Sequence, residues 1–182
     1  MNTLPGVWLD DLTRQEVASR FDGNAVVLVP VVSAGPPAPH LPLKTAVLIA
    51  RALGQGLLQR LPVVLAPVID ADSFSRERLG PVLGDRLDGL RALGARRIAV
   101  LELSASPLGT LEVPAEGLVR GGDRLADEEY VTSCLMALDP RSVRMPLLPA
   151  GSRSEAFAGE RGMSAEVDKI AAAVVSMWPD LI

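Results

Sequence analysis

The 182-residue sequence is poor in the side chains that carry much of enzyme chemistry. It contains one histidine, His40, and one cysteine, Cys134. A single cysteine cannot form an intrachain disulfide, which favours a reducing compartment such as the cytoplasm. Cys134 lies in an apolar segment, where we expect it to fill the core rather than act as a nucleophile. A catalytic zinc or two-metal site needs three or more N, O or S side chains, so such a site would here depend mainly on carboxylates.

Other features are also missing. Aromatic residues make up only 3% of the chain, and no apolar run approaches the roughly 20 residues that cross a bilayer. The N-terminus has no basic region followed by an apolar one, so neither a signal peptide nor a membrane partner is expected. A net charge of −4 gives no footprint for nucleic acid, and arginines such as Arg76 alternate with acidic residues as on a solvated face. The 48% apolar content is enough for the core of one domain over residues 1–182.

Aliphatic runs alternate with amphipathic segments along the chain. Helical spacing is found over residues 8–21, 43–60, 75–93 and 164–178, and runs typical of buried strands over 25–32, 63–69 and 97–103. The first helix would be capped by Asp11 or Thr13, the third would begin its regular part at Pro81, and Pro30 predicts a sheet edge or a bulge. Residues 108–127 suggest a β-hairpin or meander, and 151–162 a polar loop. This order predicts a three-layer α/β/α fold with a mainly parallel sheet.

The segment over residues 31–46, VVSAGPPAPHLPLKTA, joins the first predicted strand to a helix. Its prolines and glycine predict a stiff, shaped loop. The loop resembles the segment GSTEQHGPHLPLGTD of the creatininase family of metal-dependent amidohydrolases, which also lies between a strand and a helix. The matching residues are Ser33, Pro39, His40, Leu41, Pro42, Leu43 and Thr45.

In that family the glutamate, the first histidine and the closing aspartate of the loop bind metal. The resemblance places Gly35, Pro37 and Ala46 at these positions, and none of these side chains can bind a cation. His40 matches the second histidine, and we carry it over only as a residue that shapes the loop. The resemblance therefore implies a family member that lacks the metal ligands.

Later segments extend the resemblance. After the third predicted strand the family has an N-G-H-x-x-N motif, and its histidine falls at or near Ser104. The segment EYVTSCLMALDPRSVRM over residues 129–145 resembles the pattern H-A-G-E-x-E-T-S-L-M-L-A-L-x-P-x-L-V, whose histidine falls on Ala126 and second glutamate on Val131. The resemblance implies a creatininase-like fold with shortened loops and without one helix and strand of the 108–127 region. The matches in the second segment are Glu129, Thr132, Ser133, Ala137, Leu138, Pro140 and Val143.

Several carboxylates could form a replacement site. Asp70 and Asp72 follow the second predicted strand, where open α/β sheets place ligands, and could either share a cation or cap a turn. Glu102 lies inside an apolar strand and needs a partner unless it is at the sheet edge. Ser104 lacks the G-x-S-x-G context of a nucleophile. The candidate vestigial pocket comprises Ser33, Gly35, Pro37, His40, Ala46, Asp70, Asp72, Glu102, Ser104 and Glu129.

The leading hypothesis is a creatininase-like protein without the metal chemistry and without a cofactor, serving as a partner subunit, a scaffold or a small-molecule binder. Because members of the family form homo-oligomers, we expect a homo-oligomer or a hetero-oligomer with a related subunit. The alternative is a divergent amidohydrolase in which Asp70, Asp72, Glu102 and Glu129 converge around a hard cation, or in which His40 acts as a base. A third possibility, an interaction module, would show a closed pocket and a large exposed apolar patch.

Overall fold

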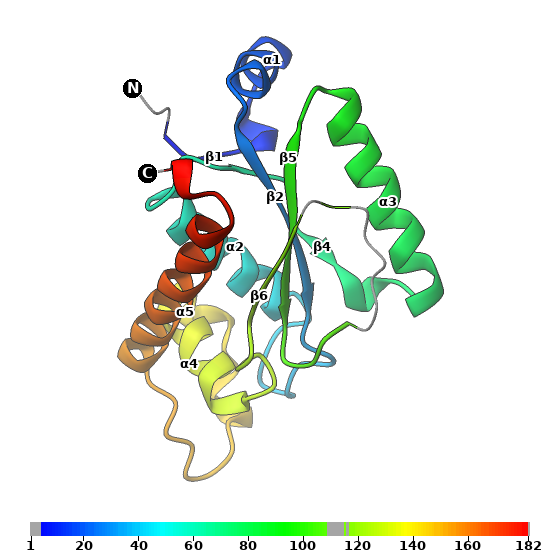
Figure 1. Cartoon of the computed structure of the whole chain (residues 1–182). Coiled ribbons are helices and arrows are strands. Elements are labelled where there is room, and N and C mark those ends of the chain that lie inside the picture. Colours follow the sequence, from blue (N-terminus) through cyan, green and yellow to red (C-terminus); the bar gives the residue numbers. More distant parts are fainter. Residues whose placement is uncertain (1–4, 109–114, 116, 182) are drawn as a thin grey trace.

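The computed structural model describes residues 5–108, 115 and 117–181 of the chain. The strands and helices are shown in Figure 1. The strands are β1 (Val7–Trp8), β2 (Val26–Ser33), β3 (Val64–Leu65), β4 (Ile69–Asp70), β5 (Arg97–Ser104) and β6 (Gly117–Gly121). The helices are α1 (Arg14–Asp22), α2 (Thr45–Leu58), α3 (Arg76–Ala92), α4 (Glu128–Leu138) and α5 (Ala156–Met177), with 3₁₀ turns η1 (Leu9–Asp11), η2 (Ala71–Ser73), η3 (Pro140–Ser142), η4 (Met145–Leu147) and η5 (Pro179–Leu181).

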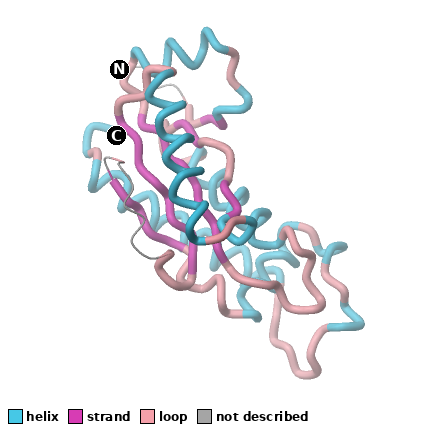
Figure 2. The backbone as a smooth tube through the Cα atoms, turned by 90° about the vertical axis from the view of Figure 1, so that its right-hand side faces the viewer, coloured by secondary structure: helices cyan, strands magenta, loops and turns pink. Residues whose placement is uncertain are grey.

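The strands form one parallel sheet in the order β1-β3-β2-β5-β6, and β4 also pairs with β2. Helices α2, α4 and α5 lie on one side of the strands, and α3 lies on the other (Figure 1). In Figure 2, which is turned so that α3 faces the viewer, this helix runs along the strands. The predicted α/β class, with a parallel sheet between helical layers, is confirmed.

Strands β2 and β5 are neighbours inside the sheet, with other strands on both outer sides. They share the longest pairing, from Val26 opposite Arg97 to Ser33 opposite Ser104. Their apolar side chains alternate between two cores, as the two-residue period of a strand requires. Leu28 packs in the core under α2, α4 and α5, whereas Val29 packs in the core under α1 and α3. Continuous aliphatic sequence is therefore the correct signal for a strand covered on both faces.

Pro30 lies in the centre of the sheet. The prediction of an edge position is wrong, because β2 pairs with β5 on one side and with β3 and β4 on the other. The ladder with β3 ends at Leu28, and pairing with β4 resumes at Val31. Residues 66–68 lie opposite residues 29–30, so the neighbouring chain carries one extra residue there, as in a bulge. Pro30, which has no N–H to donate, falls in this interruption.

The region after β5 differs from the predicted hairpin or meander. Strand β6 pairs in parallel with β5, from Ala99 opposite Gly117 to Leu103 opposite Gly121. A parallel neighbour excludes a hairpin between these two strands. The resemblance implied that a strand is missing here, but β6 is a strand within this region. Residues 109–114 and 116 lie outside the described part of the chain.

The starts of three helices test the predictions. The start of α1 selects one of two predicted caps, and the starts of α3 and α5 lie earlier in the chain than predicted. Helix α1 begins after Thr13, whose side chain accepts from the Glu16 amide while the Glu16 carboxylate accepts from the Thr13 amide. This capping box selects Thr13 over Asp11. Helix α3 begins at Arg76, so Pro81 lies inside it rather than at its start. Helix α5 begins at Ala156, so part of the predicted polar loop is helical. No helix in the described ranges is long and apolar enough to cross a membrane.

Candidate functional site

A cavity of about 1170 Å³ lies at the carboxyl ends of β2 and β4. Its walls come from the loop after β2, from η2, and from the N-terminal turns of α2, α3 and α4. The chain leaves β2 toward β3 on one side and leaves β5 toward β6 on the other. Such a reversal of direction is the topological switch point at which open α/β sheets bind ligands.

The structure brings together six of the ten predicted pocket residues. Ser33, Gly35, Pro37, Ala46, Asp70 and Asp72 line the cavity. The remaining four, which are His40, Glu102, Ser104 and Glu129, are not among the lining residues. The divergent amidohydrolase requires four carboxylates to converge. Asp70 and Asp72 line the cavity, but Glu102 and Glu129 do not.

The carboxylate of Asp72 holds the start of the loop after β2. Oδ1 accepts a hydrogen bond of 2.6 Å from Ser33 Oγ, and Oδ2 accepts from the amides of Ala34 at 3.0 Å and Gly35 at 2.9 Å. Gly35 has a φ of +69°, a left-handed conformation that favours glycine. Asp72 thus serves as an internal acceptor that fixes the loop.

Asp70 caps the turn that follows β4. Its carboxylate accepts from the Asp72 amide at 3.2 Å and from Ser73 Oγ at 2.8 Å. It is the N-cap of η2. Of the two roles that the sequence left open for Asp70, the structure supports the cap.

Glu102 lies in the interior of the sheet, so the edge position that would have explained its charge is wrong. Its side chain is 3% exposed. Oε1 accepts from the Leu108 amide at 2.6 Å, and Oε2 lies 3.2 Å from Arg120 Nε on β6. Ser104 Oγ donates to the Ser106 carbonyl at 2.7 Å, a contact that closes a loop rather than preparing a nucleophile. Glu102 is a buried carboxylate with a cation and an amide as partners.

His40 is buried at the junction between the loop and α4. Its Nε2 lies 2.8 Å from Thr132 Oγ1, and its carbonyl accepts from the Arg144 amide at 2.8 Å. Nδ1 is the one buried side-chain nitrogen or oxygen in the described ranges that has no hydrogen-bond partner. The nearest acidic oxygen is Glu128 Oε1, at 3.8 Å. These contacts hold the loop against α4 and η4.

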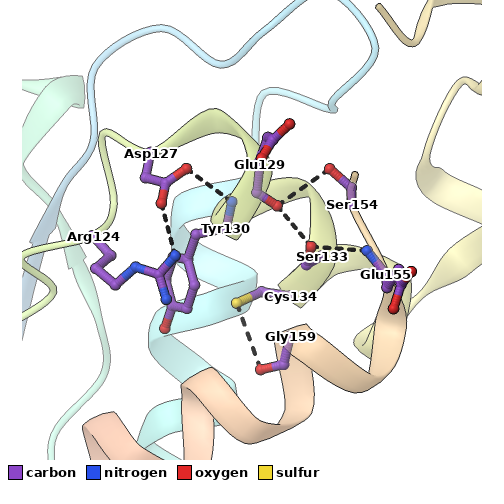
Figure 3. Close-up of polar contacts among 9 residues, drawn as sticks. All are labelled: Arg124, Asp127, Glu129, Tyr130, Ser133, Cys134, Ser154, Glu155 and Gly159. Atoms are coloured by element: carbon purple, nitrogen blue, oxygen red, sulfur yellow. Dashed lines mark hydrogen bonds and ion pairs between the residues drawn. The ribbon is translucent and has the colours of Figure 1, made fainter. Parts of the chain in front are cut away.

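Glu129 faces away from the cavity, toward the segment that enters α5. Its Oε1 accepts from the Arg153 amide at 3.3 Å, and its carbonyl accepts from Ser133 Oγ and Ser154 Oγ (Figure 3). Within the described residues, no group of three or more His, Cys, Asp or Glu side chains could hold a metal ion. Among the described residues, Gly35, Pro37 and Ala46 have no side-chain atom that could hold the metal that the sequence resemblance implies for the family.

The contact between α4 and α5 is close, with Gly159 against the backbone of Ser133 and Gly162 against the ring of Tyr130. Cys134 is fully buried in it, 3.9 Å from the Gly159 carbonyl (Figure 3), and burial raises the pKa of its thiol to about 11. Burial likewise raises the pKa of Tyr130, whose ring lies 4.2 Å from the Arg124 guanidinium. The hydrogen bond from Arg124 lowers the pKa of Asp127, the N-cap of α4. A protonated, buried thiol agrees with the core-filling role expected for Cys134.

Sequence reasoning missed two charged residues that line the cavity, Arg76 and Glu128. Each is the first residue of its helix, α3 and α4 respectively. Their positions at the starts of helices could have identified them, because the first turn of a helix that follows a parallel strand lies at the ligand-binding edge of the sheet. Arg76 was instead grouped with the charges of a solvated face.

The parallel sheet and the cavity at its switch point define an α/β protein with a pocket in the usual ligand position. No family model matches the sequence, and no curated protein matches it. The solved structures that resemble it include a mutant creatininase of Zn-Zn type, with a TM-score of 0.76 and 15% identity over 94% of this chain and 98% of that chain. A creatinine amidohydrolase has a TM-score of 0.70 with 17% identity, covering 94% and 98%, and a manganese creatininase a TM-score of 0.70 with 17% identity, covering 96% and 99%. The fold is therefore creatininase-like over nearly the whole chain.

Proposed function

We propose that this chain is a creatininase-like protein that has lost the metal-dependent amidohydrolase site and binds a small molecule without catalysis. The observation that carries the proposal is the cavity of about 1170 Å³ at the switch point. Gly35, Pro37 and Ala46, which the resemblance places at metal-ligand positions, line this cavity and offer it no side-chain donor atom. The space for a ligand is present, and these three described positions leave it without a metal-binding side chain.

Two observations favour binding over the alternatives. The cavity is open, whereas a plain interaction module would have closed it. A rebuilt carboxylate site is disfavoured because Asp70 and Asp72 are engaged in loop contacts and Glu102 and Glu129 do not line the cavity. The divergent amidohydrolase thus remains the weaker proposal.

The first test is the metal content of the purified protein, measured by elemental analysis together with an amidohydrolase assay on creatinine with added zinc, manganese or magnesium. We expect substoichiometric metal and no metal-dependent turnover. A matched pair of variants locates any bound small molecule: Ala46→Phe fills the cavity, and Ala92→Phe places the same ring on the exposed end of α3. Stoichiometric metal with metal-dependent turnover would overturn the proposal.

Assembly into an oligomer, with itself or with a related subunit, is a further proposal. Its support is the exposure of large apolar side chains, among them Leu43 at 90% and Phe157 at 66%. Met145 and Leu147 on η4 are also more than half exposed. Light scattering coupled to size exclusion tests it, and a monomer at all concentrations would contradict it. The buried single thiol is compatible with the reducing cytoplasm that we propose as the compartment.

A further inference from the structure

The polar side chains that line the cavity fall into two groups. Most are already engaged by the protein itself: Ser33 donates to Asp72, Thr45 Oγ1 donates to the Pro42 carbonyl at 2.6 Å, and Ser73 donates to Asp70. Hydrogen-bonding capacity that is satisfied internally contributes little to ligand affinity, because a ligand would have to displace an existing bond. The capacity available to a ligand therefore lies in the remaining group.

That group consists of Arg76 and Glu128. Among the described residues, the Arg76 guanidinium has no hydrogen bond or ion pair, and Glu128 has only the 3.8 Å approach to His40 Nδ1. One charge is at the start of α3 and the other at the start of α4, so they belong to different walls of the same cavity. The apolar residues of the cavity include Leu43, Ile49, Leu79, Leu83 and Val131.

His40 does not line the cavity itself, but it lies next to Glu128, which does. Its side chain is 1% exposed, and Nδ1 lies beside the Glu128 carboxylate without a partner. When the Thr132 hydroxyl donates to Nε2, the ring proton is on Nδ1 and faces Glu128. A small rotation of the Glu128 side chain would then give this buried donor an acceptor, a contact that would hold the Glu128 carboxylate beside the cavity.

We propose that the cavity binds a small zwitterion whose cationic and anionic groups are separated by an apolar chain. Glu128 contacts the cationic end, Arg76 contacts the anionic end, and the apolar lining covers the chain between them. The inference rests on the proposed function, because it names the ligand class of the same cavity. Charge-assisted hydrogen bonds at both ends make affinity depend on the presence of both charges.

The test uses a matched series of probes on the full chain, with binding measured by calorimetry at neutral pH. The probes are 6-aminohexanoate, which carries both charges, hexanoate, which carries only the anion, and hexylamine, which carries only the cation. We expect 6-aminohexanoate to bind about two- to fivefold more tightly than either single-charge probe, since Glu128 and Arg76 are solvent-exposed and each charged contact contributes a factor of this size. Equal binding of the three probes, or none by 6-aminohexanoate, would overturn the proposal.

Variants assign the two ends. Arg76→Gln should weaken hexanoate and 6-aminohexanoate but not hexylamine, whereas Glu128→Gln should weaken hexylamine and 6-aminohexanoate but not hexanoate. Arg78→Gln and Glu77→Gln are matched controls from the same first turns of α3, because neither residue lines the cavity. Equal effects of Arg76→Gln and Arg78→Gln would overturn the assignment. The probe series on the unmodified protein decides the ligand class even where a variant folds poorly.

The outcomes separate this inference from the proposed function. Metal-dependent turnover together with selective binding of 6-aminohexanoate would overturn the proposed loss of catalysis and leave the ligand class standing. No turnover and no preference for 6-aminohexanoate would overturn the ligand class alone.

Discussion

Helices α5 and α3 lie on opposite sides of the sheet and differ in how their glycines are used. A Cβ at Gly159 in α5 would overlap the carbonyl of Ser133 on α4, and one at Gly162 would stand 2.6 Å from the Tyr130 ring. A Cβ at Gly84 or Gly89 in α3 would meet no atom within 4 Å. Glycine inside a helix costs about 1 kcal/mol relative to alanine. The close approach of α4 offsets this cost in α5, and no contact offsets it in α3.

Among the substitutions considered, Gly159→Ala should have the largest effect on stability. The added methyl would force α4 and α5 apart, so we expect the free energy of unfolding to fall by about 3 kcal/mol, as in an overpacked core. Denaturant unfolding measures this loss. A thiol reagent gives an independent signal: buried Cys134, with its raised pKa, should react slowly in the native protein and faster in the variant. Unchanged stability with unchanged thiol reactivity would refute the close contact.

The second prediction concerns the buried charge of β5. Arg120→Ala leaves the Glu102 carboxylate buried without its cation, and we expect a loss of about 2 kcal/mol. Glu102→Gln leaves Arg120, whose side chain is 60% exposed and stays hydrated, so we expect a loss of only about 1 kcal/mol. Thermal or denaturant unfolding compares the two, with Arg78→Ala as a control. Equal losses would contradict the expectation that Glu102 is buried while Arg120 stays hydrated.

On α3, Gly89→Ala should have the opposite sign to Gly159→Ala. Because the position is exposed, helical and free of neighbours, alanine should raise the free energy of unfolding by about 0.5–1 kcal/mol. The same unfolding experiment measures it. Any destabilisation at Gly89 would mean that α3 has a close neighbour there, and the contrast with α5 would fail.

The smallest effect concerns the cap of α4. The pKa of Asp127 is lower in the folded than in the unfolded chain, so its contribution is complete above the ordinary aspartate pKa of about 3.9 and is lost as the pH falls through the folded value. Asp127→Asn keeps a side-chain acceptor but removes the charge. We expect a loss below about 1 kcal/mol at pH 7, since the pair is exposed, and the difference should vanish in acid. A pH-independent difference would exclude this linkage.

The sequence predicted the layers of the fold because aliphatic runs and helical stripes report burial directly. It placed α5 too late, since Gly159 and Gly162 have the local pattern of a loop and only the surface of α4 explains them. It misjudged β6 for a similar reason. Whether a strand pairs in parallel or as a hairpin depends on its neighbour, and a short sequence full of glycine does not encode that choice.

The site was predicted in part. The loop after β2 and the two aspartates follow strands, and topology brings the ends of parallel strands to one edge. Glu102 was recognised as unusual, but its partner Arg120 is reached only through the register of β6. Arg76 and Glu128 were missed because a charge in the first turn of a helix has the same local pattern whether it faces solvent or a cavity.

The contact between Asp72 and the loop after β2 has an electrostatic consequence. The amides of Ala34 and Gly35 converge on one carboxylate oxygen, as in the backbone concavities that hold anions. Converging N–H dipoles attract negative charge and repel positive charge, so this end of β2 has the polarity opposite to that of a cation site. The negative charge that these amides attract is supplied by Asp72. The loop is held to η2, the turn that follows β4, by a carboxylate of the protein, so its first residues have a partner within the chain.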